Sequence, residues 1–169
     1  MRFLALILLL LLSFTSCKSS KLATKNKSVS KTGTPNSKHP KNLKAENIIT
    51  HAEQFIGVRY KYGGITKKGM DCSGLIYVSY KNENINLPRI SRDMATKGIS
   101  ISLKDVKKGD LLFFQTNKNK RVINHVGLVT ESIDYNIKFI HSTSSKGVIT
   151  SSLSESYWQS SFKEARRFL

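Results

Sequence analysis

The sequence predicts an α+β domain over residues 44–169, in which N-terminal helices pack on an antiparallel sheet. Three observations support this prediction. Apolar residues recur at helical spacing over residues 45–56 and again over residues 72–82. From Leu111 onward, short apolar runs alternate with turns, which is the pattern of strands. Helices that come first and strands that follow are typical of α+β folds, and about 125 residues are enough for one core.

An apolar leader precedes this domain. Residues 1–16 contain one arginine, an apolar run from Leu4 to Leu12 and small polar residues before Cys17, which is the pattern of an export signal. The run is shorter than the roughly 20 residues that span a bilayer, and a short N-terminal membrane anchor is the alternative. The Phe-Thr-Ser-Cys sequence at its end resembles the lipobox of bacterial lipoproteins. This implies that Cys17 carries lipid, such as palmitate, and becomes the new N-terminus.

A basic segment, residues 17–43, connects the leader to the predicted domain. From Lys18 to Lys44 there are eight lysines and no acidic residue, and the whole chain has a net charge of +17. The segment has too few apolar side chains to offset its ordering entropy, so we predict a disordered tether of roughly 30 Å. It is either a solvated spacer or a binder of anionic lipids and acidic wall polymers. Nucleic acid is not expected as a partner, because an exported lipoprotein would rarely meet it.

The first predicted helix of the domain ends at Gly57. Its apolar face consists of residues at helical spacing: Ala45, Ile48, Ile49, Ala52, Phe55 and Ile56. His51 falls off this face and is predicted to be exposed to solvent. Residues 59–64 then form a short extended piece that ends in a turn at its two glycines.

The second predicted helix begins at a cysteine. One face of this helix carries residues at helical spacing: Cys72, Leu75, Ile76, Ser79 and Tyr80. Asp71 is suited to cap the helix, so the Cys72 thiol would lie in the first turn, where free N–H groups and the helix dipole stabilise a thiolate. If Cys17 is lipidated, Cys72 has no partner for an intramolecular disulfide. This indicates a reactive thiol, and a buried core cysteine is the alternative.

The remaining elements follow a break in the chain at residues 87–89. Ser91 is placed to cap a short helix that ends at Gly98. The predicted strands are residues 111–114, 126–130, 137–140, 148–150 and 165–169. Residues 116–121 form a charged loop, and residues 132–136 form a turn between two neighbouring strands.

Two histidines lie at matching ends of predicted strands. His125 precedes the strand at 126–130, and His141 follows the strand at 137–140. If these strands are antiparallel neighbours, both imidazoles lie at the same edge of the sheet. The start of the cysteine helix packed there would unite a nucleophile, a base and an orienting residue, namely Cys72, His125 and His141. Each histidine alone is also consistent with a strand-end residue bonded to a loop, and the spacing does not match a zinc site.

A series of motifs in this chain resembles the NlpC family of bacterial cell-wall cysteine peptidases in order and spacing. The motifs are Tyr60-Lys61-Tyr62-Gly63-Gly64, Met70-Asp71-Cys72-Ser73-Gly74-Leu75, Leu87-Pro88-Arg89, Gly109-Asp110-Leu111-Leu112-Phe113-Phe114, Asn124-His125-Val126-Gly127 and Phe139-Ile140-His141-Ser142. The resemblance spans nearly all of the predicted domain. It implies a reduced papain-like fold in which Cys72 is the nucleophile, His125 the base and His141 the third polar residue.

The same resemblance implies further site residues. Tyr60 matches a tyrosine that lines the active site near the oxyanion. Asp71 and Ser73 match positions that contact the free amine or the backbone of the substrate. No metal and no cofactor are implied.

The function implied by the resemblance is that of a monomeric endopeptidase that cleaves stem peptides of peptidoglycan, commonly between γ-linked D-glutamate and a diamino acid. Lipid on Cys17 would hold it on a membrane facing the periplasm, the outer membrane in a Gram-negative cell. One alternative is a catalytically silent wall-binding module, which would have a damaged triad. The other is an amidase or an acyltransferase on the same scaffold, because the same three catalytic residues can attack any activated carbonyl.

Overall fold

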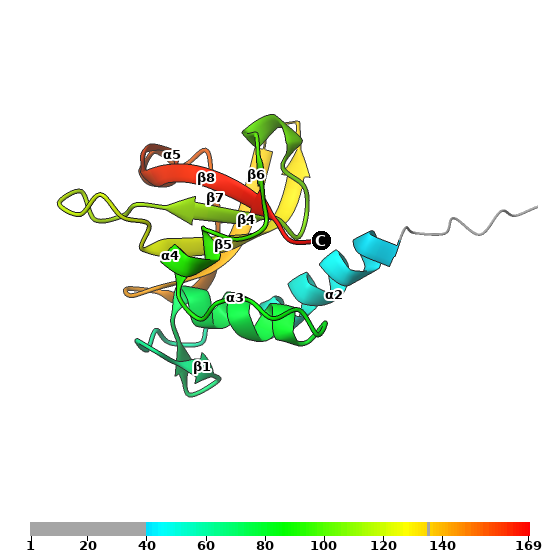
Figure 1. The fold of residues 1–169 in the computed structure, drawn as a ribbon. Coiled ribbons are helices and arrows are strands. Elements are labelled where there is room, and N and C mark those ends of the chain that lie inside the picture. Colours follow the sequence, from blue (N-terminus) through cyan, green and yellow to red (C-terminus); the bar gives the residue numbers. More distant parts are fainter. Residues whose placement is uncertain (1–39, 135) are drawn as a thin grey trace, which may run out of the picture. The chain divides into compact units, whose positions relative to one another are not determined.

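The structure is a computed structural model that describes residues 40–134 and 136–169 (Figure 1). It confirms the α+β prediction: α2 (Pro40–Glu53) and α3 (Cys72–Lys81) precede a six-stranded antiparallel sheet in the order β3-β8-β4-β5-β6-β7. The strands of this sheet are β3 (Ile99–Ile101), β4 (Leu111–Phe114), β5 (His125–Ile133), β6 (Asn136–Thr143), β7 (Gly147–Ser152) and β8 (Phe162–Arg167). The predicted export signal and Cys17 lie outside the described residues.

The predicted strands are found, and the structure also contains several shorter elements. These are a hairpin of β1 (Ile65–Thr66) and β2 (Gly69–Met70), the helices α4 (Ser91–Met94) and α5 (Ser156–Ser161), the 3-10 turn η1 (Leu103–Asp105), and β3. Of these, only α4 was expected. Its predicted cap was wrong, because Ile90 and not Ser91 occupies the N-cap position, without a side-chain hydrogen bond.

Helix α2 begins at Pro40, inside the segment that was predicted to belong to the tether. Proline is favoured in the first turn of a helix, where its missing N–H has no partner to lose. The predicted apolar face is buried except for Ile56, which is 57% exposed because the helix ends at Glu53 and the chain turns away. The prediction for His51 was also wrong: its ring is half-buried edge-on to Phe55, with 5.3 Å between ring centroids.

Two apolar clusters lie on the two faces of the sheet, and the alternation of side chains along β4 separates them. Leu111 and Phe113 pack with the buried faces of α2 and α3, whereas Leu112 and Phe114 pack with Trp158 of α5. Figure 1 shows α2 and α3 lying along one side of the sheet and α5 apart from them. The start of α3 and the loop before β5 both border the cleft that forms the candidate site.

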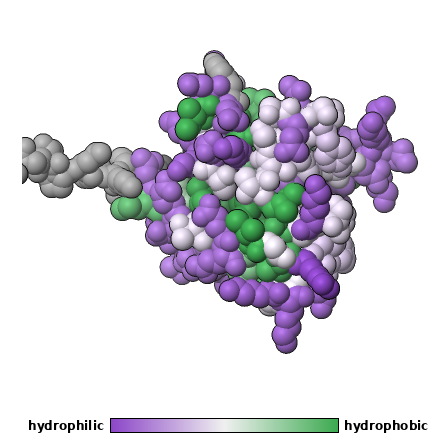
Figure 2. Space-filling model, turned by 180° about the vertical axis from the view of Figure 1, so that it is seen from behind, coloured by the Kyte–Doolittle hydropathy of each residue, from purple (hydrophilic) through white to green (hydrophobic). Residues whose placement is uncertain are grey.

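Polar residues cover much of the outer surface, around an apolar area that is visible in the middle of the face in Figure 2. Over residues 40–134 and 136–169, no helix has both the length and the apolar character that a membrane crossing requires.

Candidate active site

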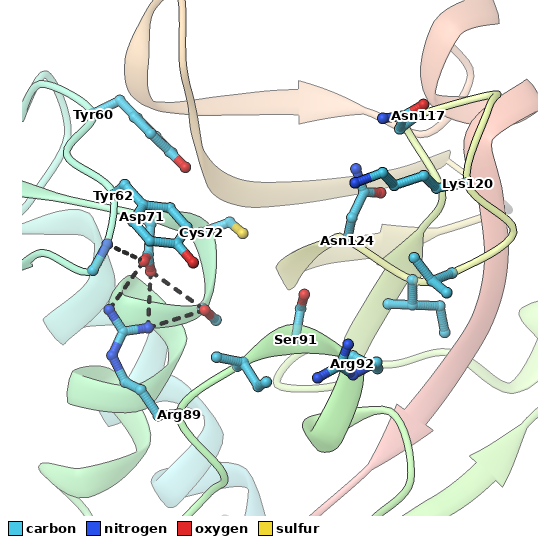
Figure 3. Close-up of a pocket in the computed structure, with 15 residues that line it drawn as sticks. Tyr60, Tyr62, Asp71, Cys72, Arg89, Ser91, Arg92, Asn117, Lys120 and Asn124 are labelled. Carbon is cyan, nitrogen blue, oxygen red and sulfur yellow. Dashed lines mark hydrogen bonds and ion pairs between the residues drawn. The ribbon is translucent and has the colours of Figure 1, made fainter.

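A cleft of about 690 Å³ opens beside the start of α3. Figure 3 shows its two walls. Tyr60, Tyr62 and Cys72 form one wall, and the loop before β5 forms the other, with the start of α4 between them. The full lining is Tyr60, Tyr62, Gly63, Asp71, Cys72, Ser73, Arg89, Ile90, Ser91, Arg92, Asn117, Lys120, Val122, Ile123 and Asn124. Four residues predicted for the site, Tyr60, Asp71, Cys72 and Ser73, therefore share this cleft.

Asp71 caps α3, as the sequence predicted. Its Oδ1 accepts a hydrogen bond of 2.6 Å from the backbone N–H of Gly74, which satisfies a free donor of the first turn. Position 74 must be glycine for a local reason, because a Cβ there would collide with the carbonyl oxygen of Gly64. The chain before the helix thereby approaches its first turn closely, and Cys72 is held at the start of α3.

Arg89 completes the structure around this carboxylate. Its guanidinium donates to both Asp71 oxygens, at 2.9 and 3.0 Å, and to the Ser73 hydroxyl at 3.0 Å. The backbone N–H of Gly63 donates to Asp71 Oδ2 at 2.8 Å. The Ser73 hydroxyl also donates to Asp71, at 3.3 Å. Both Asp71 oxygens are thus occupied within the protein.

Contact of Asp71 and Ser73 with the amine or backbone of a substrate stays a prediction, and in the structure both side chains bond to protein groups. Asp71 is 7% exposed and its charge is compensated by Arg89. A buried carboxylate in a two-pronged pair with arginine is a positioning element, because its lone pairs are already used. Arg89 is a functional residue that sequence reasoning quoted in a motif but gave no role. The available signal in the sequence was the acidic residue directly before the cysteine helix, because a buried carboxylate needs a cation beside it.

The Cys72 thiol is buried, and burial raises its pKa to about 11. Hydrogen bonds from backbone N–H groups, those of Val126, Ser73 and Cys72, lower the pKa of the thiol. The expected stabilisation of a thiolate by the helix start is therefore present but is outweighed by desolvation. At neutral pH the unliganded protein holds a neutral thiol.

His125 and His141 form the predicted pair. Strands β5 and β6 are antiparallel neighbours, and the Nε2 atom of His125 lies 2.9 Å from the Nδ1 atom of His141. Burial lowers the pKa of His125 to about 4. Burial, followed by the charge of His125, lowers the pKa of His141 to about 2. Both imidazoles are therefore neutral at neutral pH, which a general base requires.

Cys72 packs in the same apolar cluster as Val126, the residue that follows His125 at the start of β5. A hydrogen bond from the backbone N–H of Val126 lowers the pKa of the Cys72 thiol. Among the described residues, no hydrogen bond joins the thiol to an imidazole; catalytic hydrogen bonds are often long before a substrate binds. His125 and His141 are buried behind the cleft wall and are not part of its lining.

Tyr60 lies on the same wall of the cleft as the thiol. Its backbone forms a bridge with Met70, and its hydroxyl points into the cleft above Cys72 (Figure 3). Burial, followed by the neighbouring Cys72 and Asp71, raises the pKa of the hydroxyl. Tyr60 therefore stays protonated and can donate a hydrogen bond next to the sulfur.

Trp158 is a second residue that sequence reasoning missed. Its ring is stacked on His125, with 5.2 Å between centroids and 23° between planes. It also lies 4.5 Å from the His141 ring at 85°. The only signal in the sequence was that this is the chain's single tryptophan.

Comparison with known proteins gives consistent matches. The model of the NlpC/P60 family matches residues 57–167. The chain is 37% identical over 136 residues to the probable endopeptidase NlpC of Escherichia coli K12, covering 76% of this chain and 85% of that protein. It is 40% identical over 123 residues to murein DD-endopeptidase MepS/murein LD-carboxypeptidase of the same strain, covering 72% of this chain and 62% of that protein.

A similar fold occurs among solved structures. The crystal structure of an NlpC/P60 family protein from Bacillus cereus ATCC 10987 superposes with a TM-score of 0.66 at 29% identity. The match covers 74% of this chain and 40% of that chain.

Proposed function

The chain belongs to the NlpC/P60 family, and from this premise we propose that it is a peptidoglycan endopeptidase whose nucleophile is Cys72. The observation that supports the assignment most directly is the position of Cys72. The thiol lies at the start of α3, in the wall of a cleft, and α3 packs against the sheet whose neighbouring strands β5 and β6 carry His125 and His141. A silent wall-binding module would not need these groups together.

The geometry supports one sequence of proton transfers. The proposed mechanism uses the tautomer in which His125 donates from Nε2 to His141 Nδ1, across the 2.9 Å that separates these atoms, so that the Nδ1 atom of His125 can take the thiol proton. Substrate binding brings the imidazole and the thiol into contact, and the proton moves as the sulfur attacks the carbonyl carbon. The C–S bond forms while the carbonyl electron pair moves to the oxygen, where the Tyr60 hydroxyl donates.

The second half of the reaction returns the proton. The tetrahedral intermediate collapses, the C–N bond breaks and the His125 imidazolium protonates the leaving amine. A thioester on Cys72 remains. Water then attacks this thioester, His125 takes its proton, and the free acid and the thiol are released. His141 orients the imidazole throughout through its 2.9 Å hydrogen bond.

The charge of the cleft fits a substrate with free carboxylates. Arg89 is neutralised by Asp71, but Arg92 and Lys120 also line the cleft, across from Cys72 in Figure 3. Arg92 has only a 3.5 Å exposed contact with Asp93. The stem peptides of peptidoglycan carry such carboxylates, and γ-linked D-glutamate has one on the acyl side of its γ-bond.

We therefore expect hydrolysis between γ-D-glutamate and the diamino acid. Digestion of defined stem peptides with the purified protein, followed by mass spectrometry, identifies the bond. The expected products are a fragment that ends in D-glutamate and one that begins with the diamino acid. Chelators should leave the rate unchanged. Products cut at the lactyl amide would contradict the endopeptidase assignment and indicate an amidase.

A second candidate bond is the D,D cross-link between two stems. Two observations favour it: the carboxylate of Asp71 is already occupied by protein donors, and a relative at 40% identity is named a murein DD-endopeptidase. The same digestion distinguishes the two bonds. Cleavage of the D,D cross-link would convert cross-linked dimers to monomers and would leave single stem peptides uncut. That result would keep the nucleophile and reject the γ-D-glutamyl bond.

We further propose that lipid on Cys17 holds the enzyme on a membrane, with residues 17–39 as a tether before the catalytic domain. Each buried CH₂ of an acyl chain contributes about 0.8 kcal/mol to membrane binding, so several chains anchor stably where one does not. Cys17→Ala should therefore move the protein from the membrane fraction to the soluble fraction. Hydrolysis of soluble stem peptides should not change. Retention of the variant in membranes would instead indicate an uncleaved N-terminal anchor.

A further inference from the structure

The histidine pair has fewer hydrogen bonds than an orienting system usually has. His141 is fully buried, and its Nε2 atom has no hydrogen-bond partner among the described residues. Its one polar contact is the bond to His125. A buried ring with one hydrogen bond can still rotate about it, so another interaction must hold the plane of His141.

Aromatic packing supplies that interaction. Phe139 lies 4.7 Å from His141, and Phe114 lies 5.9 Å from His125. Among the described aromatic side chains, Trp158 alone contacts both imidazoles, parallel to the ring of His125 and perpendicular to that of His141. The two imidazoles are themselves perpendicular, at 86°. One rigid indole therefore restricts the planes of both rings.

We propose that Trp158 is a positioning residue of the catalytic site, which fixes the relative orientation of His125 and His141 and keeps water from them. The proposal rests on the proposed cysteine mechanism. Trp158 is 7% exposed and belongs to the apolar cluster on the face of the sheet opposite to α2 and α3. The base of the reaction is thus supported from the face that does not carry the nucleophile.

The surroundings of the pair contain few groups that titrate. Phe114 packs on the pair from β4, Phe139 from β6 and Trp158 from α5. Apart from the effect of His125 on His141, no charged side chain of the described residues shifts the pKa of either imidazole; desolvation dominates both. Loss of the indole would admit water, so the pKa of His125 would rise toward its ordinary value of 6.5.

The test compares Trp158→Leu, Trp158→Phe and the matched control Phe162→Leu. Phe162 packs on Phe114 but contacts neither histidine, so its loss weakens the same cluster without touching the pair. In Trp158→Leu we expect kcat to fall by roughly 10- to 100-fold with KM nearly unchanged, since small misplacements of catalytic groups have effects of this size. Trp158→Phe, which keeps a flat ring, should recover most of kcat.

The pH profile separates this role from a structural one. Neutral His125 is the active form, so a raised pKa moves the acid limb of kcat/KM to higher pH in Trp158→Leu, whereas the limb stays in place in Phe162→Leu. NMR titration of the imidazoles without substrate should show the same upward shift in folded Trp158→Leu and a smaller one in Trp158→Phe, and it does not depend on hydrolysis. An unmoved imidazole titration, or a rate loss that only follows the unfolded fraction, would overturn the proposal. Failure of the wild type to cleave any stem peptide would reject the proposed function and leave the NMR test intact.

Discussion

Replacing Cys72 with serine should lower stem-peptide hydrolysis by three orders of magnitude or more, roughly the loss seen when a covalent nucleophile is removed. Serine keeps the size of the side chain and the start of α3, but a hydroxyl ionises far less readily than a thiol. The expected loss is in kcat, measured by product release from a defined stem peptide.

Two controls accompany this variant. Cys17→Ser removes the chain's other cysteine and should leave hydrolysis of soluble peptides unchanged. The melting temperature of Cys72→Ser should stay close to that of the wild type, because Asp71 still caps the helix. A folded Cys72→Ser protein that retained most of its activity would exclude the proposed nucleophile.

Substitutions of the two histidines should have unequal effects. His125→Ala removes the group that takes the thiol proton and later protonates the leaving amine, so a loss of roughly 10²- to 10⁴-fold is expected. His141→Asn and His141→Gln keep a polar group that can accept from the His125 Nε2–H. Part of the activity should therefore remain, as expected for an orienting residue. The measurement is kcat/KM for each variant on the same stem peptide.

The comparison with His141→Ala decides between the two roles. This variant removes the acceptor and leaves the Nε2–H of a buried imidazole without its partner, so it should be more damaging than His141→Asn. His51→Ala is a suitable control, because this half-buried histidine lies on α2 and contacts Phe55 rather than the pair. If His125→Ala were tolerated while His141→Ala was inactive, the two assignments would have to be exchanged.

Much of the fold was predictable because its signals are local. The Asp71 cap, the apolar face of α3 and the alternating strand β4 each depend on residues close together in the sequence. The meeting of His125 and His141 followed from one further step, the antiparallel pairing of neighbouring strands. These are the cases in which short-range pattern and topology point to the same structure.

The parts that were missed depend on contacts between distant segments. Arg89 reaches Asp71 across 18 positions, and Trp158 reaches His141 from a short helix that has no clear periodic pattern. The burial of the thiol was missed for the same reason. The start of a helix favours a thiolate, but the sheet packed over α3 removes water from Cys72, and that burial cannot be read from the helix itself.

The most direct test of the central claim is to find the acyl group on Cys72 during turnover. Protein quenched in acid while it hydrolyses a defined stem peptide is digested, and the peptide that contains residues 69–81 is examined by mass spectrometry. We expect this peptide to carry the mass of the acyl half of the substrate, and the adduct to be absent in Cys72→Ser. Turnover with the acyl group on another residue, or equal turnover in Cys72→Ser, would contradict the account.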